Sequence, residues 1–272
     1  MPFTLIRGTF DPKAGRPDGD SVRFRPDDPS LVFRLRQRGR PPKINQNNGT
    51  VQLRFEGIDT MESRANPPIS GAATTSNLEL LGTPNGDEEA PGYILSNQLG
   101  PHGRPIAFVF TGDPPSGEND GDSIFLDADR VKQSVNFLQV ERGHAYPLFY
   151  DTLYSDLRST FYDGVVEARS HGLGVWADDA SQVGAEWNGE ASLATMPPLW
   201  PKLWRRLDTY ERDPDIVDPQ RLDEFEDYLR FQRPERVFIL SQGRSTDLVN
   251  VVTVNGNRAG LDRQPEDIVV MS

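Results

Sequence analysis

The sequence predicts a mixed α+β fold in which a small antiparallel sheet or barrel comes first and helices follow. Short apolar alternations bounded by Gly, Pro, Asn and Asp dominate residues 1–127, a pattern typical of half-buried strands. From residue 128 onward, apolar residues recur at intervals of three and four, which favours helices. With 272 residues, the chain is long enough to bury a core without disulfides or metals.

Six segments of the first half have the strand pattern. They are PFTLIRGTF (2–10), SVRFRP (21–26), LVFRLRQ (31–37), TVQLRFEGI (50–58), PIAFVFTG (105–112) and DSIFLDAD (122–129). The stretch 66–99 is rich in Pro, Gly, Ser and Thr, so we expect a long loop there, with a helix near 72–81.

Helical spacing follows in two segments, 128–143, which ends at a glycine, and 153–170. The composition then becomes small and polar, which indicates a domain boundary near Gly184. We therefore expect one domain over 1–184 and a C-terminal extension over 185–272.

The extension has its own pattern of elements. Residues 219–231 are typical of an amphipathic helix, and 236–241 and 247–259 of strands, with a turn at Asn255-Gly256. The extension is therefore predicted to be a small α+β appendage.

The charge balance argues against a protein that coats nucleic acid through bulk positive charge. The chain carries 29 basic and 41 acidic residues, a net charge of −12. Residues 1–50, however, contain ten Lys and Arg against five Asp, a local balance of +5. A basic face on an acidic protein therefore stays open.

Composition also excludes several kinds of site. Cysteine is absent, which removes thiol nucleophiles, disulfides and Cys-bearing zinc sites, and only three histidines are present. The N-terminal residues lack a signal-peptide pattern, and no apolar stretch approaches the length of a membrane span. We expect a cytoplasmic protein without membrane association, with export by another route left open.

The residues that suit chemistry lie in three separate segments, DGDSV (18–22), RFEGIDTME (54–62) and HGRP (102–105). Asp20 and Asp59 could supply two carboxylates to a Ca²⁺ site completed by a carbonyl and waters. Glu62 is suited to deprotonate a water beside the metal. Arg54 and Arg104 could neutralise the charge that builds up on an attacked phosphodiester.

These segments, with the GLGVWADD end of the third helix, resemble the staphylococcal nuclease family over about residues 4–180. The resemblance implies an OB-type five-stranded β-barrel with packed helices, and Ca²⁺ held by Asp20, Asp59 and the carbonyl of Thr60. It also implies that Glu62 acts on the attacking water and that Arg54 and Arg104 bind the scissile phosphate. The implied activity is a Ca²⁺-dependent nuclease acting on DNA, RNA or both and leaving 3′-phosphate ends.

The sequence departs from the family pattern near this site. Insertions at 26–48 and 66–99 lengthen the chain, and Pro101 and His102 stand where family members often place a lysine and a tyrosine. The extension 185–272 has no counterpart in the minimal family domain. The nucleotide pocket is therefore expected to differ.

Four further residues are candidates for contact with the substrate. Arg34 and Arg36 belong to an alternating run over 33–40, where a strand would project its arginines from one face along a phosphate backbone. A solvated edge strand is the alternative for this run. His102 neighbours Arg104, and Tyr150 loosely matches an aromatic contact of the family.

Two functions remain in view. Single aspartates near strand ends commonly cap turns, but the complete set of charged residues favours the nuclease. The alternative is a catalytically inactive OB-fold module that binds nucleic acid or a partner protein. The sequence leaves the oligomeric state open.

Overall fold

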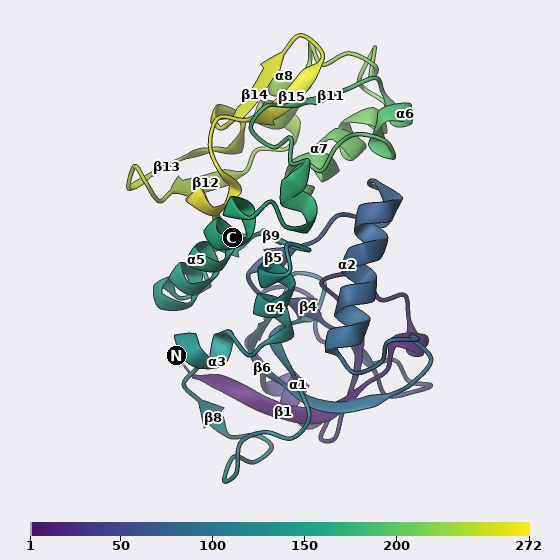
Figure 1. Ribbon diagram of the computed structural model, residues 1–272, viewed down its shortest axis with the longest axis vertical. Coiled ribbons are helices and arrows are strands. Elements are labelled where there is room, and N and C mark those ends of the chain that lie inside the picture. Colours follow the sequence, from purple (N-terminus) through teal and green to yellow (C-terminus); the bar gives the residue numbers. More distant parts are fainter. Residues whose placement is uncertain (1) are drawn as a thin grey trace. The chain divides into compact units, whose positions relative to one another are not determined.

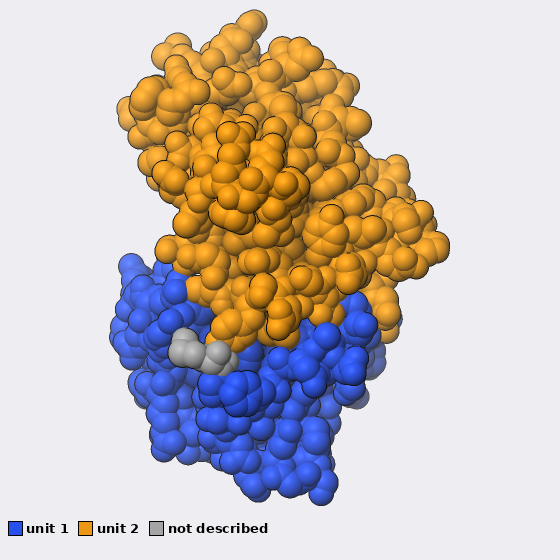
Figure 2. All heavy atoms as spheres, turned by 90° about the vertical axis from the view of Figure 1, so that its left-hand side faces the viewer, with its two compact units in different colours: residues 1–56, 73–139 blue, residues 57–72, 140–272 orange. Residues whose placement is uncertain are grey.

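The computed structural model describes residues 2–272 and confirms the mixed α+β class (Figure 1). The chain divides into two compact units, coloured separately in Figure 2. Unit 1 comprises Met1–Glu56 and Ala73–Gln139, and unit 2 comprises Gly57–Ala72 and Val140–Ser272. Each unit thus combines segments that are distant in the sequence.

A seven-stranded sheet forms the centre of unit 1. Its strands run in the order β3-β2-β1-β6-β7-β4, and β8 also pairs with β1. Every pairing is antiparallel except that of β4 with β7. The bounds are β1 Phe3–Phe10, β2 Arg23–Pro26, β3 Val51–Gln52, β4 Arg54–Phe55, β6 Ala90–Leu99, β7 Pro105–Thr111 and β8 Ser123–Ile124. The two outer strands, β3 and β4, are separated in the chain only by Leu53, so the sheet is nearly closed and barrel-like.

Apolar residues on both faces of these strands are buried, Phe24 and Ile94 on one face and Leu5 and Phe108 on the other. Leu5, Phe24, Ile94 and Phe108 have no exposed surface at all. Burying such side chains stabilises the unit by about 1.5–3 kcal/mol each. The predicted strands at 2–10, 21–26 and 105–112 are confirmed.

Four helices carry residues of unit 1. They are α1 Ser30–Arg34, α2 Pro67–Leu80, whose first residues belong to unit 2, α3 Ala128–Val131 and α4 Val135–Glu141, whose last residues belong to unit 2. The helix expected near 72–81 is present as α2, but the long loop over 66–99 is wrong because β6 occupies its last ten residues. The helix expected over 128–143 is broken into α3 and α4.

The strand expected over 31–37 is wrong, because Ser30–Arg34 form helix α1. Asp28 accepts a hydrogen bond from the backbone N–H of Ser30, which favours a helical turn. Leu31 and Val32 are buried from this turn. Burial of adjacent residues on one side of a turn overrides the alternating pattern.

Unit 2 contains two small sheets and a strand pair. One sheet has the order β10-β16-β12-β13, the second has the order β11-β15-β14, and β5 pairs with β9. The bounds are β5 Ile58–Asp59, β9 Tyr146–Pro147, β10 Phe149–Tyr150, β11 Ala185–Glu186, β12 Arg236–Ile239, β13 Arg244–Asp247, β14 Val252–Asn255, β15 Arg258–Leu261 and β16 Ile268–Val270. The strand expected at 236–241 and the hairpin expected within 247–259 are confirmed.

The helices of unit 2 include one that the sequence pattern left unassigned. They are α5 Ser155–Ser170, α6 Glu190–Leu193, α7 Pro201–Glu211 and α8 Phe225–Asp227, followed by a π-helical turn at Tyr228–Gln232. Helix α5 confirms the prediction for 153–170, and α7 is the unassigned helix. The helix expected over 219–231 is reduced to α8 and the π turn.

The boundary predicted near Gly184 falls inside unit 2. Strand β10 precedes it and pairs in parallel with β16 near the C-terminus. Independent folding of residues 1–184 stays a prediction. In the part of the chain that the structure describes, none of the helices has the length and hydropathy required to cross a lipid bilayer.

Candidate functional site

The loop that carries Asp20 is held in unit 1 by side chains of two helices. Asn77 of α2 donates to the carbonyl oxygen of Asp18 at 2.6 Å, and Gln139 of α4 donates to that of Gly19 at 2.7 Å. The carbonyl oxygen of Asp20 accepts from the N–H of Phe55 at 2.9 Å. These bonds fix the buried Asp20 beside strand β4.

The two candidate phosphate-binding arginines lie at the same end of neighbouring strands. Strands β4 and β7 are parallel, with Arg54 opposite Ile106, and Arg104 lies two residues before Ile106. The guanidinium Nη1 of Arg54 is 3.7 Å from Oδ2 of Asp20. Unit 1 therefore brings Asp20, Arg54 and Arg104 to one end of its barrel-like sheet.

A tight turn positions Arg104 and His102. Gly100 donates its N–H to the carbonyl of Arg104 at 2.8 Å, and Gly103 donates to the carbonyl of Gly100 at 2.9 Å. Gly103 has a φ of +76°, and a Cβ there would lie 2.1 Å from the carbonyl oxygen of Pro41, so the turn requires glycine. His102 is exposed on this turn.

Most of the basic segment 34–43 lies beside this hairpin as irregular chain instead of an alternating strand, whereas Arg34 is the last residue of helix α1. Arg36 donates its N–H to the carbonyl of Asn97 at 3.3 Å, and Arg40 donates to that of Pro101 at 3.1 Å. The side chain of Arg36 also donates to Oε1 of Gln98 at 3.0 Å. Arg34 and Arg36 are exposed, so the segment presents positive charge beside the turn that carries His102.

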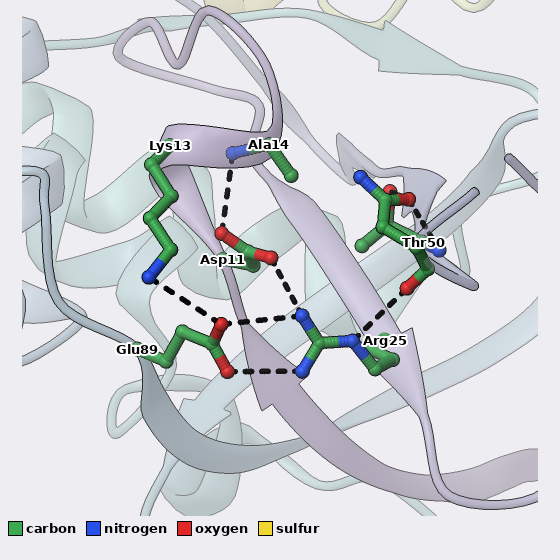
Figure 3. Close-up of polar contacts among 7 residues, drawn as sticks. Asp11, Lys13, Ala14, Arg25, Thr50 and Glu89 are labelled. Carbon is green, nitrogen blue, oxygen red and sulfur yellow. Dashed lines mark hydrogen bonds and ion pairs between the residues drawn. The ribbon is translucent and has the colours of Figure 1, made fainter.

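Arg25 and Lys13, two other basic residues of the first 50, pair with acidic residues. Figure 3 shows Arg25, whose guanidinium binds Asp11 at 2.7 Å and Glu89 at 2.9 Å, while Lys13 lies 3.7 Å from Glu89. The hydrogen bond between Arg25 and Glu89 is the main cause of two pKa shifts: it lowers the pKa of Glu89 and raises the pKa of Arg25. Both shifts favour the charged form. Segment 34–43 carries five of the ten basic residues of the first 50 and contains no acidic residue.

The remaining candidate residues belong to unit 2. Strand β5 ends at Asp59 and pairs with β9, which places Asp59 opposite Tyr146. Asp59 and Thr60 are buried, and Glu62 is partly exposed. The chain links this cluster to Arg54 through only four intervening residues.

An arginine of the C-terminal extension binds both carboxylates of this cluster. The guanidinium of Arg205 on α7 lies 2.5 Å from Oδ2 of Asp59 through Nη2. Its Nη1 lies 3.1 Å from Oδ1 of Asp59 and 2.9 Å from Oε1 of Glu62. One guanidinium therefore engages both oxygens of Asp59 and one oxygen of Glu62.

The electrostatics of this cluster keep Arg205 charged. Burial alone lowers the pKa of Arg205, but Asp59 and Glu62 outweigh burial and raise it well above its ordinary value. Hydrogen bonds between ionised partners in a forked arrangement are among the strongest in proteins. Arg205 is thus a permanent cation at the candidate metal ligand.

Helix α7 also binds the chain that follows Glu62. Both carboxylate oxygens of Asp208 accept from Nη2 of Arg64 at 2.9 Å, and that guanidinium lies 5.8 Å from the ring centroid of Trp204. Asn66 donates to the carbonyl of Met196 at 3.3 Å. Among residues 2–272, Asn66 alone of the non-glycine residues has a positive φ, at 45°. The loop 60–66 is therefore fixed to the C-terminal extension.

The oxygen atoms of Asp20, Asp59 and Thr60 are of the kind that binds Ca²⁺, but their present arrangement does not suit the ion. Carboxylate and carbonyl oxygens are what Ca²⁺ prefers, yet both oxygens of Asp59 are bound to Arg205. Asp20 belongs to unit 1, whereas Asp59 and Thr60 belong to unit 2. No group of three or more His, Asp or Glu side chains able to hold a metal occurs among residues 2–272. The side chains around Asp59, as they stand, do not fit a divalent cation.

Tyr150 belongs to a different cluster of unit 2. Its ring lies 5.9 Å from Nζ of the buried Lys202, which pairs with Glu235 at 2.6 Å. Burial lowers the pKa of Lys202, and Glu235 offsets this only in part. These contacts join Tyr150 to Lys202 and Glu235, and they include neither Asp59 nor Glu62.

Sequence reasoning missed Arg205. The stretch LWPKLWRRLDTY has apolar residues at helical spacing, Trp200, Leu203, Trp204 and Leu207, all buried, and this pattern could have predicted α7. Nothing in the spacing indicates a partner for Arg205 that lies 146 residues away.

No protein-family model matches the sequence, and neither does any curated protein.

Proposed function

We propose that the chain is a nuclease that hydrolyses phosphodiester bonds of DNA or RNA, and that the sheet of unit 1 is an OB-type barrel. The observation that supports this most is the grouping of Asp20, Arg54 and Arg104 at one end of the barrel-like sheet. Two arginines at adjacent strand starts suit paired hydrogen bonds to a phosphate.

The proposed reaction is attack of water on phosphorus. The bond from the water oxygen to phosphorus forms, the bond from phosphorus to the 5′-oxygen breaks, and the leaving oxygen takes a proton from solvent. Glu62 receives the proton of the attacking water, and Arg54 and Arg104 stabilise the extra negative charge on the phosphoryl oxygens. The family resemblance implies this direction of cleavage, which leaves a 3′-phosphate.

The resemblance also implies Ca²⁺ as the cofactor. Arg205 binds both oxygens of Asp59, which Ca²⁺ would need. Activity should therefore be measured both with and without Ca²⁺. The nucleic-acid backbone would extend from Arg104 past His102 to Arg36 and Arg34. Segment 34–43 lies beside the turn that carries His102 and is hydrogen-bonded to it.

Replacement of Glu62 by Gln tests the assigned chemistry. We expect Glu62→Gln to lower the turnover number about 100-fold or more, because a general base is lost. The dissociation constant for a DNA oligonucleotide should change less than about threefold, because only one partly exposed carboxylate is neutralised. Glu88→Gln, an exposed carboxylate in unit 1, is the matched control. Equal losses in binding and turnover would contradict the role of Glu62 as base.

A second function is favoured by one observation. Arg205 occupies carboxylate oxygens of Asp59 and Glu62 that a metal or a reacting water would use. This arrangement suits a module that binds nucleic acid through its arginines without cleaving it. Binding that weakens in Arg54→Ala, together with no cleavage by the unsubstituted protein, would establish this alternative.

A further inference from the structure

The carboxylates of Asp59 and Glu62 share one guanidinium, which comes from the C-terminal extension. We propose that Arg205 is the resident cation of this carboxylate pair, and that Ca²⁺ binds Asp59 only when this guanidinium is removed. The proposal deepens the proposed function, because the importance of a Ca²⁺ site for turnover rests on nuclease activity. Its consequence for Ca²⁺ binding rests on unit 2 alone.

Both carboxylate oxygens of Asp59 already bind Arg205. Ca²⁺ needs carboxylate oxygens directed at it, and both oxygens of Asp59 are directed at Arg205, at 2.5 and 3.1 Å. A divalent ion bound to the same carboxylate would lie within a few ångströms of a fixed positive charge, and this repulsion is only partly screened at a buried site. The guanidinium and the ion therefore compete for one position.

Buried neighbours on α7 hold Arg205 in place. Leu203, Trp204 and Leu207 on either side of it are buried, and the indole N–H of Trp204 donates to the carbonyl of Leu193 at 3.1 Å. One turn further along, Asp208 binds Arg64, which lies two residues after Glu62. Arg205 therefore lies on a packed helix, which positions its guanidinium next to Asp59 and Glu62.

Asp59 is a buried carboxylate. Its side chain is only 2 % exposed, and a buried carboxylate is strongly destabilising unless a cation compensates it. Where a metal is the only counter-charge, such a site depends on metal for its stability. Here the chain supplies the counter-charge itself, with a planar fork that matches the carboxylate. The C-terminal extension is thus part of the candidate site.

Calorimetric titration of the full chain with Ca²⁺ tests the proposal. The unsubstituted protein and Asp59→Asn should give the same Ca²⁺ titration, since Asp59 is held by Arg205. Arg205→Gln should bind Ca²⁺ at least about 100-fold more tightly than the unsubstituted protein, because the repulsion is gone. Arg205→Gln/Asp59→Asn should lose this gain. Arg205→Lys, which keeps the charge, and Arg212→Gln, at the residue that follows the same helix, should both behave like the unsubstituted protein.

Two results would overturn the proposal. One is Ca²⁺ binding by the unsubstituted protein that disappears in Asp59→Asn, and this comparison needs no change at Arg205. The other is a folded Arg205→Gln with no gain in Ca²⁺ affinity. If Arg205→Gln unfolds too easily for calorimetry, its melting temperature should rise with Ca²⁺, and that of Arg205→Gln/Asp59→Asn should not. Absence of nuclease activity in every variant would contradict the proposed function and leave these binding results in force.

Discussion

Three cationic residues of α7 each meet a carboxylate from another segment of unit 2. Arg205 binds Asp59, while Lys202 and Arg206 both bind Glu235, at 2.6 and 2.7 Å. Burial raises the pKa of Glu235, but the two cations outweigh it and leave the pKa below its ordinary value of 4.5. Glu235 therefore stabilises the folded state in its charged form.

This balance predicts how stability depends on pH at Glu235. A carboxyl group whose folded pKa is lowered stabilises the protein above its unfolded pKa, and the contribution fades as pH falls through the folded pKa. Glu235→Gln should lower the free energy of unfolding by about 3 kcal/mol at pH 7, since Lys202 and Arg206 lose their counter-charge. The difference from the unsubstituted protein should shrink at pH values well below 4.5. Urea denaturation at pH 7 and at a pH well below 4.5 measures this difference in stability. A difference that is the same at both pH values would contradict the role assigned to Glu235.

The residues of the candidate site differ in how far the sequence could place them. Asp20, Arg54 and Arg104 each lie at the end of a strand or in a turn beside it, and alternation locates such strand ends but not the order of the strands in the sheet. Arg205 is a different case, because its carboxylate partners are 146 and 143 residues away in the chain. Local spacing carries no information about such a contact.

At the level of elements, the run 50–58 shows why one predicted strand became three. Its alternation is real, since Val51, Leu53 and Phe55 are buried. Gly57 then adopts a φ of +79°, and the chain leaves the sheet of unit 1 to form β5 in unit 2. A glycine that follows a strand pattern was the available signal for this break. The strand β6 was missed because its flanking residues resemble a loop in composition.

Helix α4 fixes strands β4 and β7 through one side chain. Asn136 has no exposed surface, and its Nδ2 donates to the carbonyl oxygens of Glu56 and Ala107 at 2.9 Å each. Its Oδ1 accepts from the N–H of Val109 at 2.9 Å. Asn136 therefore holds the two strands whose starts carry the candidate phosphate-binding arginines.

Substitution of this asparagine should be costly. Asn136→Leu should lower the free energy of unfolding by about 2–4 kcal/mol, because buried backbone groups lose their partners. Gln133→Leu, a matched change at an exposed position of the same region, should stay within about 0.5 kcal/mol of the unsubstituted protein. Equal urea midpoints for the two variants would show that Asn136 does not hold the strands together.

At the scale of the whole molecule, the extension is integrated into unit 2. Strand β10 pairs with β16, and the indole N–H of Trp200 donates to the carbonyl of Pro147 at 3.0 Å. The composition change near Gly184 indicated a boundary, but these pairings connect segments on its two sides. Long-range pairing of short strands leaves no periodic trace in a sequence.

Truncation after Gly184 should therefore destabilise the remaining part of unit 2. Such a chain lacks Arg205 and β16, so Asp59 loses its counter-charge and β10 loses its partner. We expect fast amide exchange over 57–66 and 146–170, with protection retained in β1 and β6. Removal of Met271 and Ser272 alone is the control, and protection equal to that of the full chain in the 1–184 chain would support the independent domain instead.

The proposed function assigns the cleavage of phosphodiester bonds to a site that contains Arg54 and Arg104. The most direct test is digestion of single-stranded DNA, double-stranded DNA and RNA by the purified full chain in Ca²⁺, Mg²⁺ or EDTA, beside Arg54→Ala. We expect cleavage of at least one substrate and a rate about 100-fold lower in Arg54→Ala, because a charge-stabilising group is lost. No cleavage under any condition, or an undiminished rate in Arg54→Ala, would contradict it.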